Sequence, residues 1–171
     1  MHRMRIVMCC ICAVVLAATA DAQGVIFEPT TGTVSGTGTI VSSAIPGTPA
    51  ALEGATFNFT ARYLDKSLVP TGSTVFNDEA AELSFLSNTY DWLVVYGNRA
   101  WYGGTGVVAV NGDVQPAEFL VAIVDNAKSG GRFRMKIWTA SGTIFDNQPG
   151  APDAAPATRP VLTGSVDIRL K

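Results

Sequence analysis

Histidine and cysteine are nearly absent from this sequence. The chain has 171 residues, and its one histidine and three cysteines all lie at its start, at His2, Cys9, Cys10 and Cys12. Without this start, a serine or cysteine nucleophile has no histidine base, and zinc has no imidazole or thiolate ligand. Disulfides are excluded as well. The rest of the chain must be stabilised by a hydrophobic core.

The first 22 residues have the pattern of a cleaved export signal. Arg3 and Arg5 give a positive start, residues 6–18 form an uncharged apolar run, and small-residue cleavage sites end at Ala20 and Ala22. The run is shorter than the roughly 20 residues that a membrane-spanning helix needs. We therefore expect a signal peptide over 1–22 and no membrane span after its cleavage. The protein is then secreted or held at the cell surface, with the periplasm as the alternative compartment.

The chain has no large excess of charge of either sign. Removing Arg3, Arg5 and Asp21 from 12 basic and 14 acidic residues leaves 10 and 13, a net charge of −3. Nucleic acid and anionic membranes are not expected partners, because no basic stripe is present. Cleavage after residue 22 of 171 leaves 149 residues, enough for one ordinary domain over 23–171.

A sustained helical period is also missing after the signal, and alternation of two dominates. In 55–63, Phe57, Phe59, Ala61 and Tyr63 face one way and the polar residues between them face the other. Turn signals at close to 8–12 residues predict about ten strands. We expect an all-β single domain, a two-sheet sandwich with jelly-roll or Greek-key connections, with a closed β-barrel as the alternative. The Pro- and Ala-rich segment 148–160 is expected to be a loop.

The stretch YDWLVVYGNRAWYGGTG, 90–106, contains five aromatic residues. Strict alternation places Tyr90, Trp92, Val94 and Tyr96 on one face of a central strand that is covered on both sides. Gly97-Asn98 is a hairpin turn signal. The glycines of the return strand suggest a bulge, or a place where another backbone comes close.

Four segments together resemble a small bacterial secreted β domain. They are GATFNFTARYLD, VPTGSTVF, LSFLSNTYDWLVVYGNRAWYGGTG and FRMKIWTASGTIFDNQ. The domain follows choice-of-anchor-P regions in surface proteins, and the resemblance covers about Gly36 to Gln148. It implies a compact β module with no assigned catalytic activity. The chain departs from that pattern at Thr139 and Gly131, where acidic residues are usual in such domains.

The candidate ligand contacts are aromatic. Trp138 lies on the cationic face of 132–138, where it either shields a cation or contacts a ligand. Trp101 and Tyr102 are adjacent in a strand and must point to opposite faces. Each of the three aromatics either packs in the core or stacks on a sugar ring or a partner surface.

Calcium is the most credible metal for a secreted β domain without histidine and cysteine, because oxygen ligands alone can bind it. Asp125-Asn126 and Asp146-Asn147 both end predicted strands and are the candidate ligands, but turn formation is the favoured explanation of both pairs.

We expect a non-enzymatic extracellular or cell-surface module with a binding, adhesion or structural role, and no required cofactor. A polysaccharide or another surface protein is the expected partner. The alternatives are a carbohydrate-binding module that uses exposed Trp and Tyr, and a glycosidase with two carboxylates. Its candidate carboxylates are Asp91, Asp113, Glu118, Asp125 and Asp146.

Overall fold

The computed structural model describes residues 32–42, 54–65, 67–126 and 130–170. The expected signal peptide, 1–22, lies outside these residues. None of the helices in the described ranges is long and apolar enough to cross a membrane. The elements are β1 (Gly32–Val41), β2 (Gly54–Tyr63), β3 (Pro70–Asp78), a 3-10 turn (Glu79–Ala81), β4 (Leu83–Tyr96), β5 (Arg99–Val110), β6 (Asp113–Val124), β7 (Arg132–Thr139), β8 (Gly142–Asp146) and β9 (Thr163–Leu170).

All nine described strands belong to one antiparallel sheet with the order β8-β7-β6-β5-β4-β3-β2-β1-β9. Strands β1 to β8 follow one another as neighbours, and β9 returns to pair with β1. The all-β class is confirmed, with nine strands where about ten were expected. The two-sheet sandwich is not confirmed, because these strands form a single sheet with meander connections.

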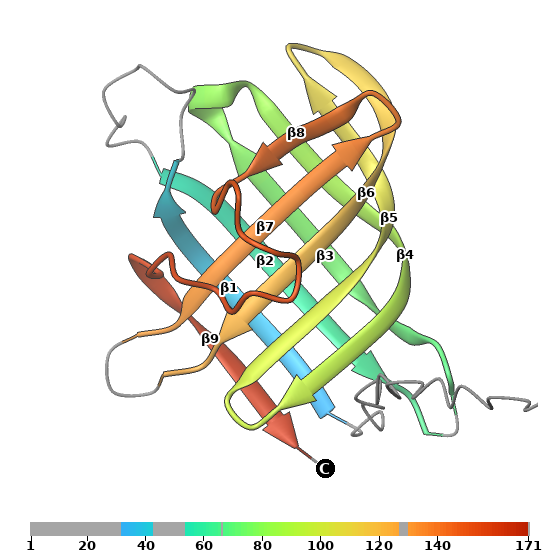
Figure 1. Ribbon diagram of the computed structural model, residues 1–171, viewed down its shortest axis with the longest axis vertical. Helices are drawn as coiled ribbons and strands as arrows, with labels where there is room; N and C mark the ends of the chain where they lie inside the picture. The colour runs from blue at the N-terminus through green and yellow to red at the C-terminus, as the bar shows by residue number, and fades with distance from the viewer. Residues whose placement is uncertain (1–31, 43–53, 66, 127–129, 171) are drawn as a thin grey trace, which may run out of the picture.

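The sheet is curled into a half-barrel, so that β6 and β7 cross in front of β1, β2 and β3 (Figure 1). The two end strands of the sheet, β8 and β9, do not pair with each other. Instead, residues 159–162, just before β9, form hydrogen bonds to strands on both sides of the half-barrel. The Phe133 amide donates to the Arg159 carbonyl at 2.9 Å, and the Leu162 amide donates to the Thr39 carbonyl at 2.8 Å. This segment therefore connects β7 to β1.

The concave face of the sheet holds the main core. On β2, Phe57, Phe59 and Ala61 are buried and alternate with exposed polar residues, which confirms the predicted alternation. The Phe57 ring stacks on Phe133 of β7 with ring centroids 4.2 Å apart. Because β2 and β7 are not neighbours in the sheet, this contact spans the interior and holds the curl closed.

Strand β4 does not alternate strictly, because its register against β5 shifts between Ser87 and Thr89 and again between Tyr90 and Trp92. Each shift adds one residue to β4 and so changes the face of the residues that follow. Tyr90 is consequently 5% exposed in the interior, while Trp92 is 38% exposed on the outer face. The prediction that these two side chains share a face is wrong, and so is the prediction that this strand is covered on both sides. The predicted bulge is confirmed, opposite the glycines of β5.

Candidate aromatic groove

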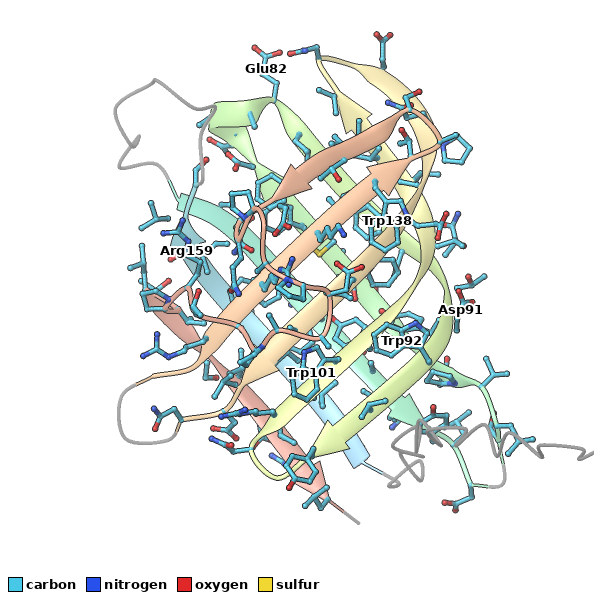
Figure 2. All side chains as sticks on the ribbon, viewed as in Figure 1. Glu82, Asp91, Trp92, Trp101, Trp138 and Arg159 are labelled. Atoms are coloured by element: carbon cyan, nitrogen blue, oxygen red, sulfur yellow. The ribbon has the colours of Figure 1, made fainter. Side chains whose placement is uncertain are left out.

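Three tryptophans lie near one another on the outer face of the sheet (Figure 2). Trp92 comes from β4, Trp101 from β5 and Trp138 from β7. Their positions follow from the register. Val94 pairs with Trp101, and two pairs further along the strands Trp92 lies opposite Gly103. The strand pairing thus gathers aromatic side chains from three strands on one convex surface.

Gly103 makes room for the Trp92 indole on β5. A methyl group at Gly103 would come within 3.0 Å of Cζ2 of Trp92, and closer still to the carbonyl of Phe119. The indole therefore rests against the backbone of β5, as aromatic side chains often do beside a glycine in a sheet. Beyond Gly103 in the same row, Leu120 of β6 continues the apolar surface.

The segment between β8 and β9 covers part of this outer face and forms one wall of a groove. Ala157 is 3% exposed and packs with Leu120 and Ala122 of β6. The Trp101 indole N–H donates to the Ala155 carbonyl at 3.2 Å. This hydrogen bond ties the indole to the covering segment, while the side chain still lines the groove.

Arg134 anchors this covering segment. Its side chain is 0% exposed and makes an ion pair with Asp146, with Nη2 and Oδ2 2.9 Å apart. It also donates to the Pro152 carbonyl at 2.7 Å and to the Ala151 carbonyl at 3.0 Å. Lys136 adds a second link, 2.6 Å from Oδ1 of Asp153. The cationic face predicted for β7 is thus largely covered, and its charges hold the segment in place.

The resulting groove has a volume of about 700 Å³, within the range of small-molecule sites. Its lining is mostly apolar and consists of Trp92, Val94, Tyr96, Trp101, Leu120, Trp138, Asp153 and Ala154. Lys136 Nζ lies 5.2 Å from the centroid of the Trp138 ring, so the predicted cation contact at Trp138 is present. Two of the three predicted aromatic contacts, Trp101 and Trp138, therefore meet in one groove.

Trp92 and Tyr96 also line the groove but were not predicted as contacts. The bulge that puts Trp92 on the outer face was signalled only by the glycines of the facing strand. Tyr96 is 70% exposed beside the Gly97-Asn98 turn. The sequence around Asp153 and Ala154 did not indicate that they line the groove, because this depends on where the long β8–β9 connection packs on the sheet.

Tyr102, the third predicted contact, points to the interior and is 0% exposed. Its hydroxyl lies 3.1 Å from Thr74 Oγ1, which lies 2.7 Å from the Tyr90 hydroxyl. Burial raises the pKa of Tyr102 well above its ordinary value of 10.0, and burial also raises the pKa of Tyr90. Tyr102 therefore belongs to a buried hydroxyl cluster and cannot stack on an external ligand.

The buried hydroxyls predict that stability falls at alkaline pH. Unfolded tyrosines lose their protons above pH 10.0, while the folded state retains them, so the unfolded state binds fewer protons there. Below pH 10 these two tyrosines should not change the free energy of unfolding. Above pH 10 the free energy of unfolding should fall by about 1.4 kcal/mol per pH unit for each proton that the folded state retains. Urea unfolding at pH 9 to 11 measures this slope. The slope should become shallower in Tyr102→Phe, and an unchanged slope would contradict the assignment.

Three of the four calcium candidates make hydrogen bonds or ion pairs inside the protein. Asp146 is paired with Arg134, and Asn147 is buried with its amide bonded to Met135 and Phe133 of β7. Asp125 accepts from the Ile168 amide of β9 at 3.2 Å, and Asn126 follows it in the chain. The side-chain oxygens of Asp125, Asp146 and Asn147 are therefore engaged in internal contacts. No cluster of three or more His, Cys, Asp or Glu that suits a metal occurs in the ranges given above.

The predicted carboxylates are also dispersed. Asp153 is the carboxylate of the aromatic groove, and Glu118 is the carboxylate of a second hollow further along β5 and β6. Asp113 lies exposed at the Asn111-Gly112 turn, and Asp91 lies at the bulge of β4. The aromatic groove and the second hollow therefore each have one carboxylate in their lining.

Comparison of the chain with protein-family models, curated proteins and solved structures finds no match, so the assignment of a function rests on the groove itself.

Proposed function

We propose that this protein is a non-enzymatic binding module that holds a saccharide in the aromatic groove. The observation that carries the proposal is the meeting of Trp92, Trp101 and Trp138 in one open cavity. Exposed apolar patches on a soluble protein often mark interaction sites. Trp101 and Trp138 pack partly against a small cluster of Leu120, Ala122 and Ala157, but the groove lies outside the main core, and Trp92 remains 38% exposed in it.

The groove has the chemistry that a pyranose ring requires. The negative face of an indole attracts the weakly positive C–H groups on one side of a sugar ring. The indole N–H groups of Trp92 and Trp138 make no hydrogen bond to a described residue, and can donate to sugar hydroxyls. Trp101 is already committed to Ala155 and offers only its apolar surface. A ring with one apolar face and polar edges matches this combination.

The wall of the groove is preorganised for binding. The hydrogen bonds from Arg134 to Ala151 and Pro152, together with the Lys136–Asp153 ion pair, fix the covering segment before any ligand arrives. Ordering of a loop on binding would reduce affinity. A segment held by a fully buried arginine avoids most of that cost.

The same geometry favours binding over hydrolysis. Glycoside hydrolysis needs two carboxyl groups about 5–10 Å apart across the scissile bond. The groove presents Asp153 alone, and this carboxylate is paired with Lys136. A location outside the cytoplasm, where polysaccharides are accessible, is part of this proposal. It rests on the signal peptide expected over 1–22 and on the resemblance to a domain of bacterial surface proteins.

Alanine at each groove tryptophan tests the proposal. Trp92→Ala, Trp101→Ala and Trp138→Ala should each weaken binding to a polysaccharide that retains the wild type by about five- to thirtyfold, because loss of an aromatic anchor costs about 1–2 kcal/mol. Retention is measured in affinity gels over a panel of plant, algal and bacterial polysaccharides. Val114→Ala is the matched control, since Val114 is 70% exposed on β6 and does not line the groove.

Circular dichroism and thermal unfolding establish that each variant is folded before its retention is compared. A wild-type protein that is retained by none of the polysaccharides would overturn the proposal. Equal retention of wild type and all three tryptophan variants would remove the groove from the binding site.

A further inference from the structure

The cations around the groove differ in whether they already have partners. Arg134 is buried against Asp146, and Lys136 is paired with Asp153. Arg132 donates to the Thr158 carbonyl at 2.7 Å, which ties it to the covering segment. Arg99 is exposed, and its guanidinium makes no hydrogen bond or ion pair with another described residue. One guanidinium beside the groove is thus available to a ligand.

Arg99 does not line the groove itself but lies beside two of its lining residues, Tyr96 and Trp101. It begins β5 two residues before Trp101, on the same face, and pairs across the hairpin with Tyr96. Two residues along a strand cover about 7 Å, roughly the size of one sugar ring. Its side chain is also long enough to reach over that ring. A pyranose stacked on Trp101 therefore has its edge within reach of the guanidinium.

No carboxylate of the described residues makes an ion pair with Arg99. Asp125 follows the residue that pairs with Arg99 and keeps its charge, but its Oδ2 is directed to the Ile168 amide of β9. Asp91 lies on the other side of Trp92 from Trp101 (Figure 2), and Asp153 is paired with Lys136. The chain as a whole carries a net charge of −2. Arg99 is therefore a cation without an ion-pair partner in the described part of the chain, beside the aromatic groove of a chain that is acidic overall.

We propose that the groove selects a saccharide with an anionic substituent, a uronate carboxylate or a sulfate ester, and that Arg99 binds this group. The inference rests on the proposed function and names its ligand class. The planar guanidinium can donate two parallel hydrogen bonds to either anion. Because Arg99 is exposed, the contribution is moderate and screened by salt. We expect a five- to tenfold preference for the charged ligand.

Two polymers that share a backbone and differ only in their anionic groups isolate the contribution of ligand charge to binding. The purified protein is run in affinity gels that contain homogalacturonan, or homogalacturonan whose carboxyl groups are fully methyl-esterified. A sulfated galactan and its desulfated form make a second pair. The wild type should bind at least one charged polymer five- to tenfold more tightly than its neutral form. The preference should shrink when salt is raised from about 0.05 to 0.5 M.

Two arginine variants separate a local contact from general electrostatics. Arg99→Gln should abolish the preference for the charged polymer, and Arg99→Lys should restore part of it. Arg62→Gln removes the same charge from the exposed side of β2 and should leave the preference unchanged. Carboxylate-only or sulfate-only binding would support the proposal and identify the anion.

The outcomes also separate this inference from the function on which it rests. Equal binding of charged and neutral polymers, with loss in Trp101→Ala but not in Arg99→Gln, would overturn the role of Arg99 and leave the saccharide groove standing. An equal loss in Arg62→Gln and Arg99→Gln would show a general charge effect and would likewise overturn it. Binding to neither form of these polymers, together with retention by no polysaccharide of the wider panel, would overturn both.

Discussion

Replacing Arg134 by alanine is expected to lower the free energy of unfolding by about 3–5 kcal/mol. The side chain is 0% exposed and binds Asp146 together with the carbonyls of Ala151 and Pro152. Its removal leaves the Asp146 carboxylate with little solvent and without its cation, and two carbonyls lose their donor. Urea unfolding followed by circular dichroism measures the loss.

Two further variants identify the cause of that loss. Lys136→Ala removes an ion pair whose Asp153 side chain is 55% exposed, so it should cost no more than about 1 kcal/mol. The double variant Arg134→Met, Asp146→Leu removes both buried charges and should be more stable than Arg134→Ala. A cost for Arg134→Ala no larger than that of Lys136→Ala would show that the buried ion pair does not hold the covering segment.

The position of this segment is what the sequence predicted least well. The Pro- and Ala-rich composition of 148–160 indicates a loop, and the chain does lack strands there apart from one bridge between Arg132 and Pro160. Where such a loop packs depends on contacts with distant residues, which its composition does not encode. Alternation placed Arg134 on the outer face of β7, correctly, but an outer face is exposed only if nothing covers it.

Local patterns predicted the strands well because their period depends on neighbouring residues alone. On β2 each inward residue is apolar and each outward residue is polar or charged, so the period of two is unambiguous. On β4 both faces carry aromatic or β-branched residues, and the extra residue at the bulge left no mark in that pattern. The faces of Tyr90 and Trp92 therefore required the register against β5.

Local sequence patterns also could not predict whether the strands form one sheet or two. Sandwich and curled sheet have the same strands and turns, and they differ in which strands lie opposite each other. Here that choice depends on aromatic side chains of distant strands that meet in the interior. For the groove, the sequence identified Trp101 and Trp138 as candidates by type and face, while Trp92 and the wall residues depended on the curl and the covering segment.

Phe133→Ala is expected to destabilise the protein by about 3–5 kcal/mol, because it opens a cavity at the contact that holds the curl. Phe133 is 0% exposed. Its ring stacks on Phe57 at 4.2 Å and lies 5.8 Å from Phe59 and 6.4 Å from Phe76, centroid to centroid. These partners come from β2 and β3, across the interior from β7. Urea unfolding measures the change.

A double-mutant cycle with Phe57→Ala tests whether the contact itself matters. Two rings in contact should give a combined loss that is smaller than the sum of the single losses, by about 0.5–1.5 kcal/mol for an aromatic pair. The exposed Val114→Ala should change stability by no more than about 0.5 kcal/mol. Additive losses would place the two rings in separate parts of the core. The curl would then depend on the hydrogen bonds of residues 159–162 rather than on packing across the interior.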